Sequence, residues 1–142
     1  MPKELEQELH CELVDLDTLL KESDVVSLHC PLTPETRGMI GEAQFDLMKP
    51  NAIIVNEARG AVIDDKALVR ALEEGKIWGA AIDTWEKEPL DPNDPLVKME
   101  KCITTSHLGA ATRETVVRCF SVGYNNILRQ LHGEPLINQV NK

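Results

Sequence analysis

The sequence lacks the features that would direct it to a membrane or to nucleic acid. No apolar run approaches the roughly 20 residues that span a bilayer, and the N-terminal stretch MPKELEQEL has no apolar signal core. Basic residues are scarce, because 15 Lys and Arg stand against 24 Asp and Glu and give a net charge of -9. Such a charge disfavours nucleic acid and anionic lipid as partners. We therefore expect a cytoplasmic protein with no membrane or nucleic-acid partner.

Paired cysteine motifs are also absent. The four cysteines contain no C-x-x-C pair, which argues against a zinc site and against a redox motif. In a domain of this size we expect buried thiols rather than disulfides, and no metal site. The cysteines are Cys11, Cys30, Cys102 and Cys119.

The length and composition are those of one domain. The chain has 142 residues, of which 42% are hydrophobic, and this is enough for one compact unit with a real core. Length alone predicts no second domain.

Short strands rich in β-branched residues alternate with helical segments along the chain. We expect strands at Glu12–Val14, Val25–Leu28, Ile53–Asn56, Gly79–Ile82 and Ile103–Thr105. We expect helices at 15–24, Glu42–Met48, Lys66–Glu74 and Thr112–Leu131. This alternation predicts an α/β fold of parallel βαβ units, and right-handed crossovers place all the strand ends on one edge of the sheet.

Charged side chains follow three of these strands. Arg59 lies after the Ile53 strand, Glu86 and Glu88 lie after the Gly79 strand, and His107 follows the Ile103 strand. Open α/β sheets bind ligands at this edge, so the arginine, one carboxylate and the histidine are expected to converge on one crevice. On composition alone, Arg59 is better explained as a solvated loop residue and Glu88 as a surface carboxylate.

Four stretches in series resemble one enzyme family. They are SDVVSLHCPLTPETRGMI, IIVNEARGAVID, GAAIDTWEKEP and TTSHLGAAT. From about Val14 onward, the chain resembles the C-terminal part of the D-isomer-specific 2-hydroxyacid dehydrogenases, in particular the phosphoglycerate dehydrogenase-like branch. These enzymes move a hydride between a nicotinamide cofactor and a small 2-oxo or 2-hydroxy acid.

The resemblance implies three catalytic residues. Arg59 corresponds to the arginine that holds the substrate carboxylate, Glu88 rather than Glu86 to the glutamate before the proline, and His107 to the acid-base histidine. A guanidinium grips a planar carboxylate with two parallel hydrogen bonds. A histidine exchanges protons near neutral pH, and a carboxylate on its other nitrogen fixes its tautomer.

The resemblance also implies which residues line the cofactor. By match, the aspartate at position 83 faces the nicotinamide carboxamide, and the turns after the other strands line or close over the dinucleotide. The implied cofactor-binding residues are Cys30, Glu57, Ala58, Asp83, Leu108, Gly109 and Ala110. The cofactor is NAD or NADP, and the residue that separates the two is not in this sequence.

One element of a dinucleotide fold is missing from the sequence. There is no G-x-G-x-x-G turn to hold the pyrophosphate at a helix N-terminus. Aligned on the family, Met1 falls just after the second strand, so residues 1–142 are expected to form the second half of a Rossmann-like doubly wound parallel sheet plus a long C-terminal helix. In this alignment, the first βαβ unit of the Rossmann domain and the substrate domain are expected to precede Met1. We therefore expect this chain to bind dinucleotide weakly and to be inactive alone.

Unpaired surfaces predict self-association. In the usual 3-2-1-4-5-6 strand order, the Ile53 and Val25 strands would each pair with a strand that this chain does not encode, leaving unpaired edges. The helix Thr112–Leu131 has apolar residues on one stripe, namely Val117, Phe120, Tyr124, Ile127 and Leu131. A homodimer is the simplest closed arrangement. Two interpretations remain: a dehydrogenase fragment, or a non-catalytic remnant that acts as a dimerising module.

Overall fold

The computed structural model describes residues 3–141. These residues fall into two compact units, Met1–Ser106 and His107–Lys142, where the length of the chain predicts one. The first unit holds the sheet and most of the helices. The second holds a single long helix and the C-terminal tail.

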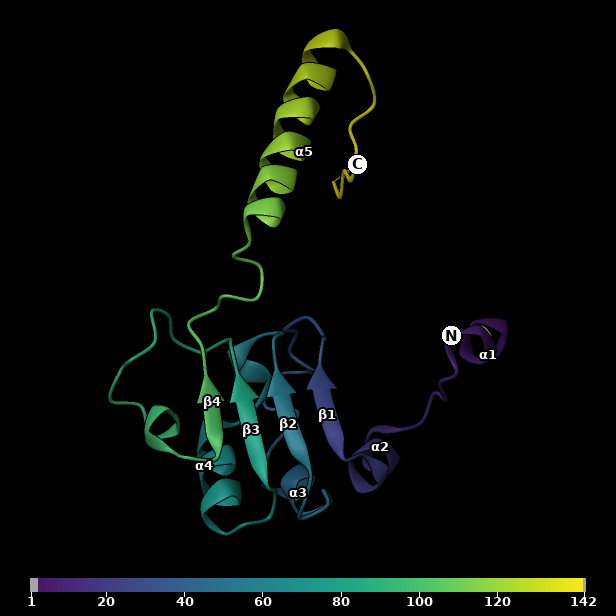
Figure 1. Cartoon of the computed structure of the whole chain (residues 1–142). Helices are drawn as coiled ribbons and strands as arrows, with labels where there is room; N and C mark the ends of the chain where they lie inside the picture. Colours follow the sequence, from purple (N-terminus) through teal and green to yellow (C-terminus); the bar gives the residue numbers. More distant parts are fainter. Residues whose placement is uncertain (1–2, 142) are drawn as a thin grey trace. The chain divides into compact units, whose positions relative to one another are not determined.

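A four-stranded parallel sheet is the centre of the first unit. Figure 1 shows its arrows pointing to one common edge. The strands are β1 (Val25–Leu28), β2 (Ile53–Asn56), β3 (Gly79–Ile82) and β4 (Cys102–Thr104). The helices are α1 (Lys3–Leu9), α2 (Leu16–Glu22), α3 (Glu42–Phe45) and α4 (Asp65–Glu73), with 3₁₀ turns η1 (Gly60–Val62) and η2 (Pro95–Lys98). The predicted α/β fold with a parallel sheet is confirmed.

The strands lie in chain order, β1-β2-β3-β4. Ile54 of β2 is therefore flanked by Val26 of β1 on one side and by Ala80 of β3 on the other. The prediction that the Ile53 strand exposes an unpaired edge is wrong. Each crossover places the next strand on the same side of the previous one, so β2 is paired with β1 and with β3. Of the two strands predicted to be edges, only β1 has an open side within the described residues.

Apolar side chains between the sheet and α4 form the core. Ile54 and Leu68 are fully buried, and α4 turns Leu68, Ala71 and Leu72 inward as its spacing predicts. The Asp64 carboxylate caps α4 by accepting from the amides of Lys66 and Ala67. After α4 the backbone reverses at Gly75, where φ is 69°. The Asp64 cap and the reversal at Gly75 therefore define the two ends of α4, which connects β2 to β3.

Two predicted elements differ in the structure. Glu12–Val14 has no strand pairing, since its few residues lie outside the four-stranded sheet. The predicted helix Glu42–Met48 is helical only as far as Phe45, although Phe45 and Met48 are both buried as expected. Helix α1 was not predicted, because its sequence KELEQEL carries too few apolar residues to give a periodic stripe.

The second unit is built on α5 (Arg113–His132). The Thr112 hydroxyl accepts from the Thr115 amide at the start of the helix, and Gly133 ends it in the left-handed region with φ 69°. All five residues of the predicted apolar stripe are exposed. The helix therefore presents an uncovered apolar face.

Within residues 3–141 no helix is long and apolar enough to cross a lipid bilayer. The same residues contain no group of three or more His, Cys, Asp or Glu arranged to hold a metal ion. The cysteines are all free thiols, but the prediction that they are buried holds fully only for Cys102. Cys11 and Cys119 are exposed, because they lie outside the sheet and its helices.

Candidate active site

The predicted catalytic residues follow three neighbouring parallel strands. Arg59 comes after β2, Glu88 after β3, and His107 after β4. The first two belong to the first unit, whereas His107 is the first residue of the second unit. His107 has a left-handed backbone with φ 59°, a conformation that is uncommon for a residue other than glycine and that gathers at functional sites.

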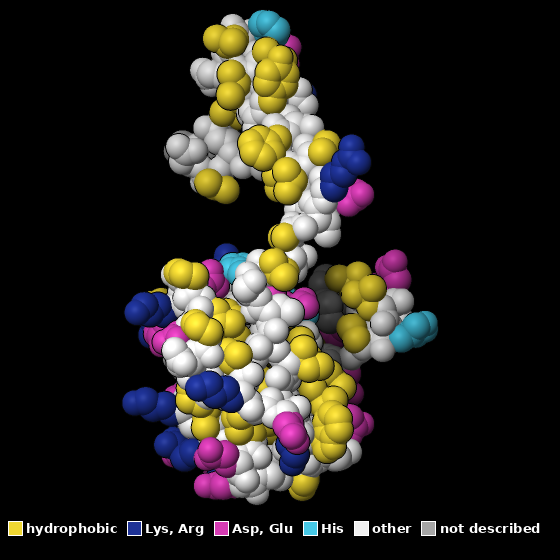
Figure 2. All heavy atoms as spheres, turned by 60° about the vertical axis from the view of Figure 1, so that its left-hand side comes forward, with side chains coloured by type: hydrophobic (Ala, Val, Ile, Leu, Met, Phe, Trp, Pro, Cys, Tyr) yellow, Lys and Arg dark blue, Asp and Glu magenta, His cyan; other side chains and the backbone are white. Residues whose placement is uncertain are grey.

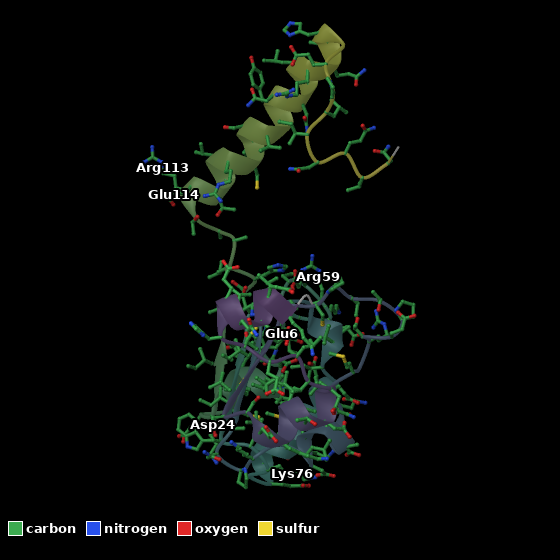
Figure 3. All side chains as sticks on the ribbon, turned by 90° about the vertical axis from the view of Figure 1, so that its right-hand side faces the viewer. Glu6, Asp24, Arg59, Lys76, Arg113 and Glu114 are labelled. Carbon is green, nitrogen blue, oxygen red and sulfur yellow. The ribbon has the colours of Figure 1, made fainter. Side chains whose placement is uncertain are left out.

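The amide side chain of Asn56 shapes the turn that presents Arg59. Asn56 is the last residue of β2 and is only 1% exposed. Its Oδ1 accepts from the Ala58 amide at 3.1 Å, and its Nδ2 donates to the Arg59 carbonyl at 3.1 Å. Because a buried amide that satisfies both partners locks the local backbone, the Arg59 side chain leaves the sheet edge from a fixed position. In Figure 3 Arg59 projects outward from that edge.

A glycine brings the Arg59 turn against the turn that carries Glu88. A Cβ placed on Gly60 would lie 2.0 Å from the Trp85 carbonyl carbon and 2.2 Å from the Glu86 nitrogen. Only a residue without a side chain allows this approach. Gly60 thus joins the loops after β2 and β3 backbone to backbone, with Arg59 next to the contact.

The loop after β3 is held by two hydrogen bonds from Trp85. The Trp85 amide donates to Glu88 Oε1 at 3.2 Å, and the Trp85 indole Nε1 donates to the Thr105 carbonyl at 2.8 Å. Glu86 instead forms a surface ion pair with Arg37 at 2.9 Å. These contacts give the two glutamates different surroundings.

Asp83 lies at the start of the same loop. Its carboxylate Oδ1 accepts from the Thr105 hydroxyl at 2.5 Å, and its amide donates to the Asn56 carbonyl at 3.0 Å. The carboxylate is thereby oriented from the adjacent strand end. The ends of β2, β3 and β4 are connected through Asn56, Asp83 and Thr105.

An open pocket of about 590 Å³ adjoins Arg59. Cys30, Glu57 and Ala58 line it with Arg59, so the structure brings together three of the predicted cofactor-binding residues. Asp83 is not part of this lining, and Leu108, Gly109 and Ala110 belong to the second unit. His29 also lines the pocket and bonds to the Ser27 hydroxyl at 2.8 Å. His29 stands directly before Cys30 in the sequence, and this position is the signal that points to it.

A second pocket, of about 680 Å³, lies beside the Glu88 loop and is lined in part by Asp65. Burial first, and then repulsion from nearby carboxylates, raises the pKa of Asp65 from its ordinary 3.8 to about 6. Those carboxylates belong to Asp94, Glu86 and Asp64, in decreasing order of effect. Burial, followed by the charges of Asp94 and Asp65, raises the pKa of the Cys102 thiol to about 11.

Asp65→Asn is expected to stabilise the fold at alkaline pH. The folded state holds the Asp65 proton up to about pH 6 and the unfolded state only to about 3.8, so stability falls as the pH rises through this window. After allowance for partial exposure and for the helix dipole at the start of α4, removal of the charge should add about 1 kcal/mol at pH 8 and little at pH 4. Urea unfolding at both pH values measures it.

Asp17→Asn is the matched control for that prediction, because Asp17 is an exposed aspartate in the first turn of α2. It should lower stability slightly at pH 8, through the lost helix-dipole interaction. If Asp65→Asn lowers the free energy of unfolding at pH 8 as much as Asp17→Asn does, the repulsion assigned to Asp65 and its neighbouring carboxylates is wrong.

Thr84→Val is expected to raise stability. Thr84 is 2% exposed, and its Oγ1 has no hydrogen-bond partner among the residues that the structure describes. Valine has nearly the same shape and removes the cost of a buried, unpaired hydroxyl. We expect a gain of about 1 kcal/mol, measured as a higher thermal midpoint. Thr18→Val, which removes a hydroxyl bonded to Asp15, should lower the midpoint; a fall for Thr84→Val as well would contradict the prediction.

Comparison with known proteins assigns the family. The profile of the D-isomer specific 2-hydroxyacid dehydrogenase NAD binding domain matches residues 1–109. The chain belongs to this family. The predicted resemblance is confirmed, and with it a domain that binds NAD.

The curated relatives include glyoxylate reductases and D-3-phosphoglycerate dehydrogenases. The chain is 48% identical over 139 residues to a glyoxylate reductase of Thermococcus litoralis, covering 98% of the chain and 42% of the relative. It is 43% identical over 139 residues to a D-3-phosphoglycerate dehydrogenase of Archaeoglobus fulgidus, covering 98% of the chain and 26% of the relative. The chain thus spans between a quarter and less than half of these proteins.

Solved structures give the same result for the fold. D-lactate dehydrogenase with NAD+ from Lactobacillus jensenii has a TM-score of 0.89 at 34% identity, over 96% of this chain and 45% of that one. The holo form of D-mandelate dehydrogenase from Rhodotorula graminis has a TM-score of 0.92 at 37% identity, over 100% of this chain and 41% of that one. The fold is therefore that of the Rossmann-type domain in these dehydrogenases.

The residues near Arg59 fit the nicotinamide end of NAD better than its pyrophosphate end. The pocket beside Arg59 has the small side chains of Cys30 and Ala58 in its lining, and the Asp83 carboxylate is held in a fixed orientation by Thr105. Both features suit the nicotinamide end of the cofactor, which needs a flat space and an acceptor for its carboxamide. The pyrophosphate end has no G-x-G-x-x-G turn in this sequence.

Proposed function

We propose that this chain forms the nicotinamide-side part of the active site in an NAD-dependent D-2-hydroxyacid dehydrogenase, with Arg59, Glu88 and His107 as the catalytic residues. The observation that carries the proposal is the contact at Gly60, which packs the Arg59 turn against the Glu88 loop. The turn that carries Arg59 is thereby packed, backbone to backbone, against the loop that carries Glu88. Sheets of this type bind their ligands at that edge.

Arg59 binds the carboxylate of a small 2-oxo or 2-hydroxy acid. Its guanidinium presents two parallel N–H donors to the two carboxylate oxygens, and this orients the neighbouring carbonyl carbon. The exposed arginine at the edge of an open pocket is accessible to such a ligand. Bound nicotinamide cofactor supplies or accepts the hydride.

His107 transfers the proton. Reduction of the carbonyl leaves an alkoxide, to which a protonated imidazole donates, and in the reverse direction the neutral imidazole accepts the hydroxyl proton. Glu88 accepts a hydrogen bond from the other imidazole nitrogen, which fixes the tautomer and favours the protonated ring. The place of His107, three residues after the end of β4, and its left-handed backbone support this role.

The cofactor-binding roles follow the same strand ends. Cys30, Glu57 and Ala58 line the nicotinamide-side pocket, and Asp83 accepts a hydrogen bond from the carboxamide. Leu108, Gly109 and Ala110 close over the bound cofactor. Without a pyrophosphate-holding turn, the chain alone binds NAD or NADP weakly and is inactive alone.

We further propose that the chain is a homodimer in the cytoplasm, where nicotinamide dinucleotides are available. An open side on β1 and the apolar face of α5 both support self-association. These surfaces also favour a second candidate function, a non-catalytic dimerising module. Activity in a reconstituted enzyme separates the two candidates.

A chimera tests the proposed activity. In it, this chain replaces the corresponding segment of the Thermococcus litoralis glyoxylate reductase, with which it shares 48% identity. We expect NADH oxidation with glyoxylate, hydroxypyruvate or another small 2-oxo acid, followed as the loss of absorbance of NADH. The chain alone is the control and should show no turnover and only weak NAD binding by calorimetry. A folded chimera that reduces none of these acids would refute the proposed function.

A further inference from the structure

Trp85 is a large side chain held inside the first unit. Figure 2 shows acidic, basic and hydrophobic side chains interspersed over one face of that unit, but Trp85 is only 7% exposed and belongs to the core cluster. It lies three residues after the end of β3, in the loop that leads to Glu88. Its contacts are therefore made with residues of this chain and need no partner to form.

The indole of Trp85 holds the backbone at the end of β4. Its Nε1 donates to the Thr105 carbonyl at 2.8 Å, and the Thr105 amide donates to the Ile82 carbonyl at 3.0 Å. Thr105 follows β4 directly and stands two residues before His107 in the sequence. Because a buried indole N–H takes a hydrogen-bond partner, this bond fixes both the ring and the backbone segment that leads to His107.

The backbone of Trp85 contacts the other two parts of the candidate site. Its amide donates to Glu88 Oε1 at 3.2 Å. A Cβ on Gly60 would lie 2.0 Å from the Trp85 carbonyl carbon and 2.6 Å from its Cα, so its main chain packs against the residue that follows Arg59. Trp85 therefore contacts the turn after Arg59, the carboxylate of Glu88 and the segment before His107.

The indole N–H is the one of these contacts that depends on the tryptophan side chain. Phenylalanine fills much of the same space but carries no donor for the Thr105 carbonyl. The amide bond and the packing on Gly60 are main-chain contacts, which a change of side chain retains. Trp85→Phe thus removes the contact with the segment before His107 and keeps the other two.

We propose that Trp85 is a positioning residue of the active site, whose indole N–H places the segment before His107 relative to the Glu88 carboxylate. It acts on the reaction through Glu88 and His107 and not by contact with substrate. The proposal rests on the proposed function, because it assigns Trp85 to the proton-transfer pair rather than to the binding of the substrate carboxylate by Arg59. Loss of the indole bond should therefore change kcat more than KM.

Hydrogen exchange of the indole protons tests the bond without any need for activity. The sequence has two tryptophans, of which Trp78 is 61% exposed and Trp85 is 7% exposed. In NMR spectra of the intact chain, the Trp85 indole proton should exchange with deuterium oxide at least about tenfold more slowly than that of Trp78. The Trp78→Phe chain tells the two signals apart. Equal exchange rates would show that Thr105 does not hold the indole, and would overturn the proposal.

Trp85→Phe in the chimera tests the role in the reaction. One net hydrogen bond corresponds to roughly 2- to 10-fold in rate, so kcat for oxidation of a 2-hydroxy acid should fall by that factor while KM stays within about twofold. The acid limb of the kcat/KM profile should move to lower pH by about half a unit, because a histidine held less firmly beside Glu88 is less favoured in its protonated form. The matched control Trp78→Phe replaces an exposed indole and should change neither quantity.

Combination with Glu88→Gln separates positioning from a general loosening of the fold. If Trp85 acts through that carboxylate, Trp85→Phe should lower kcat by less than about twofold in a chimera that already carries Glu88→Gln. In a chimera that carries Arg59→Lys its effect should be undiminished. A full loss in the Glu88→Gln chimera, or an unchanged acid limb in an active Trp85→Phe chimera, would overturn the positioning role and leave the proposed function standing. A folded parent chimera without activity would overturn both.

Discussion

Lysine in place of Arg59 is expected to lower kcat/KM for 2-oxo acid reduction by roughly 10- to 100-fold in the chimeric dehydrogenase. A charge-assisted hydrogen bond contributes about 1.5–3 kcal/mol, and each 1.4 kcal/mol is about tenfold in rate. Lysine keeps the charge but offers the carboxylate a single point of contact rather than a planar fork. The Asn56 amide bonds hold the turn through backbone groups, so the substitution should leave the fold intact. Steady-state kinetics with NADH in excess measure the effect.

Arg37→Lys is the control for this substitution. Arg37 is an exposed arginine of the same unit and pairs with Glu86 on the surface, where either cation serves almost equally well. Its kcat/KM should be within about twofold of the parent, as expected for a weak surface pair. Equal rates for the two lysine variants would remove Arg59 from the substrate site.

Gly60→Ala is expected to destabilise the chain by at least about 3 kcal/mol, or to prevent folding. The new methyl group would lie 2.0 Å from the Trp85 carbonyl carbon. The obstructing atoms are backbone, so no rotation of a side chain relieves the clash. The loops after β2 and β3 must separate, and Arg59 moves away from the loop that carries Glu88. Urea unfolding of the chain, followed by circular dichroism, gives the loss in free energy.

Gly41→Ala is the matched control for the effect of a methyl group on a glycine. A Cβ at Gly41 meets its nearest atom, Gln44 Oε1, at 3.6 Å, which is ordinary contact. Its stability should change by less than about 1 kcal/mol. If Gly60→Ala unfolds at the same urea concentration as Gly41→Ala, the two loops are not packed as described.

The sequence was sufficient to place the strand ends, because β-branched runs and their turns are local signals. β1, β2 and β3 have the predicted bounds, and the charged residues that follow them were recognised through motif spacing. The strand order was predicted less well. Pairing partners are far apart in the sequence, and no local pattern specifies which strands lie side by side.

The contacts that hold the candidate site could not be predicted from local patterns. Asn56 acts through backbone groups of its own turn, Thr105 reaches Asp83 from the end of the neighbouring strand, and Gly60 meets a loop that follows the next strand. Each depends on a register that only the folded sheet defines. The sequence signal was limited to the residue types: a buried asparagine, a threonine at a strand end and a glycine after the arginine.

The central claim, that Glu88 acts on His107 in a site shared with Arg59, is tested most directly by the pH profile of the chimera carrying Glu88→Gln. In oxidation of a 2-hydroxy acid the histidine must be neutral to accept the proton, so kcat/KM falls on the acid side of the profile. A neutral amide no longer favours the protonated imidazole. We expect the acid limb to move to lower pH by about one unit, with lower maximal activity. An acid limb at the same pH as in the parent chimera would contradict the account.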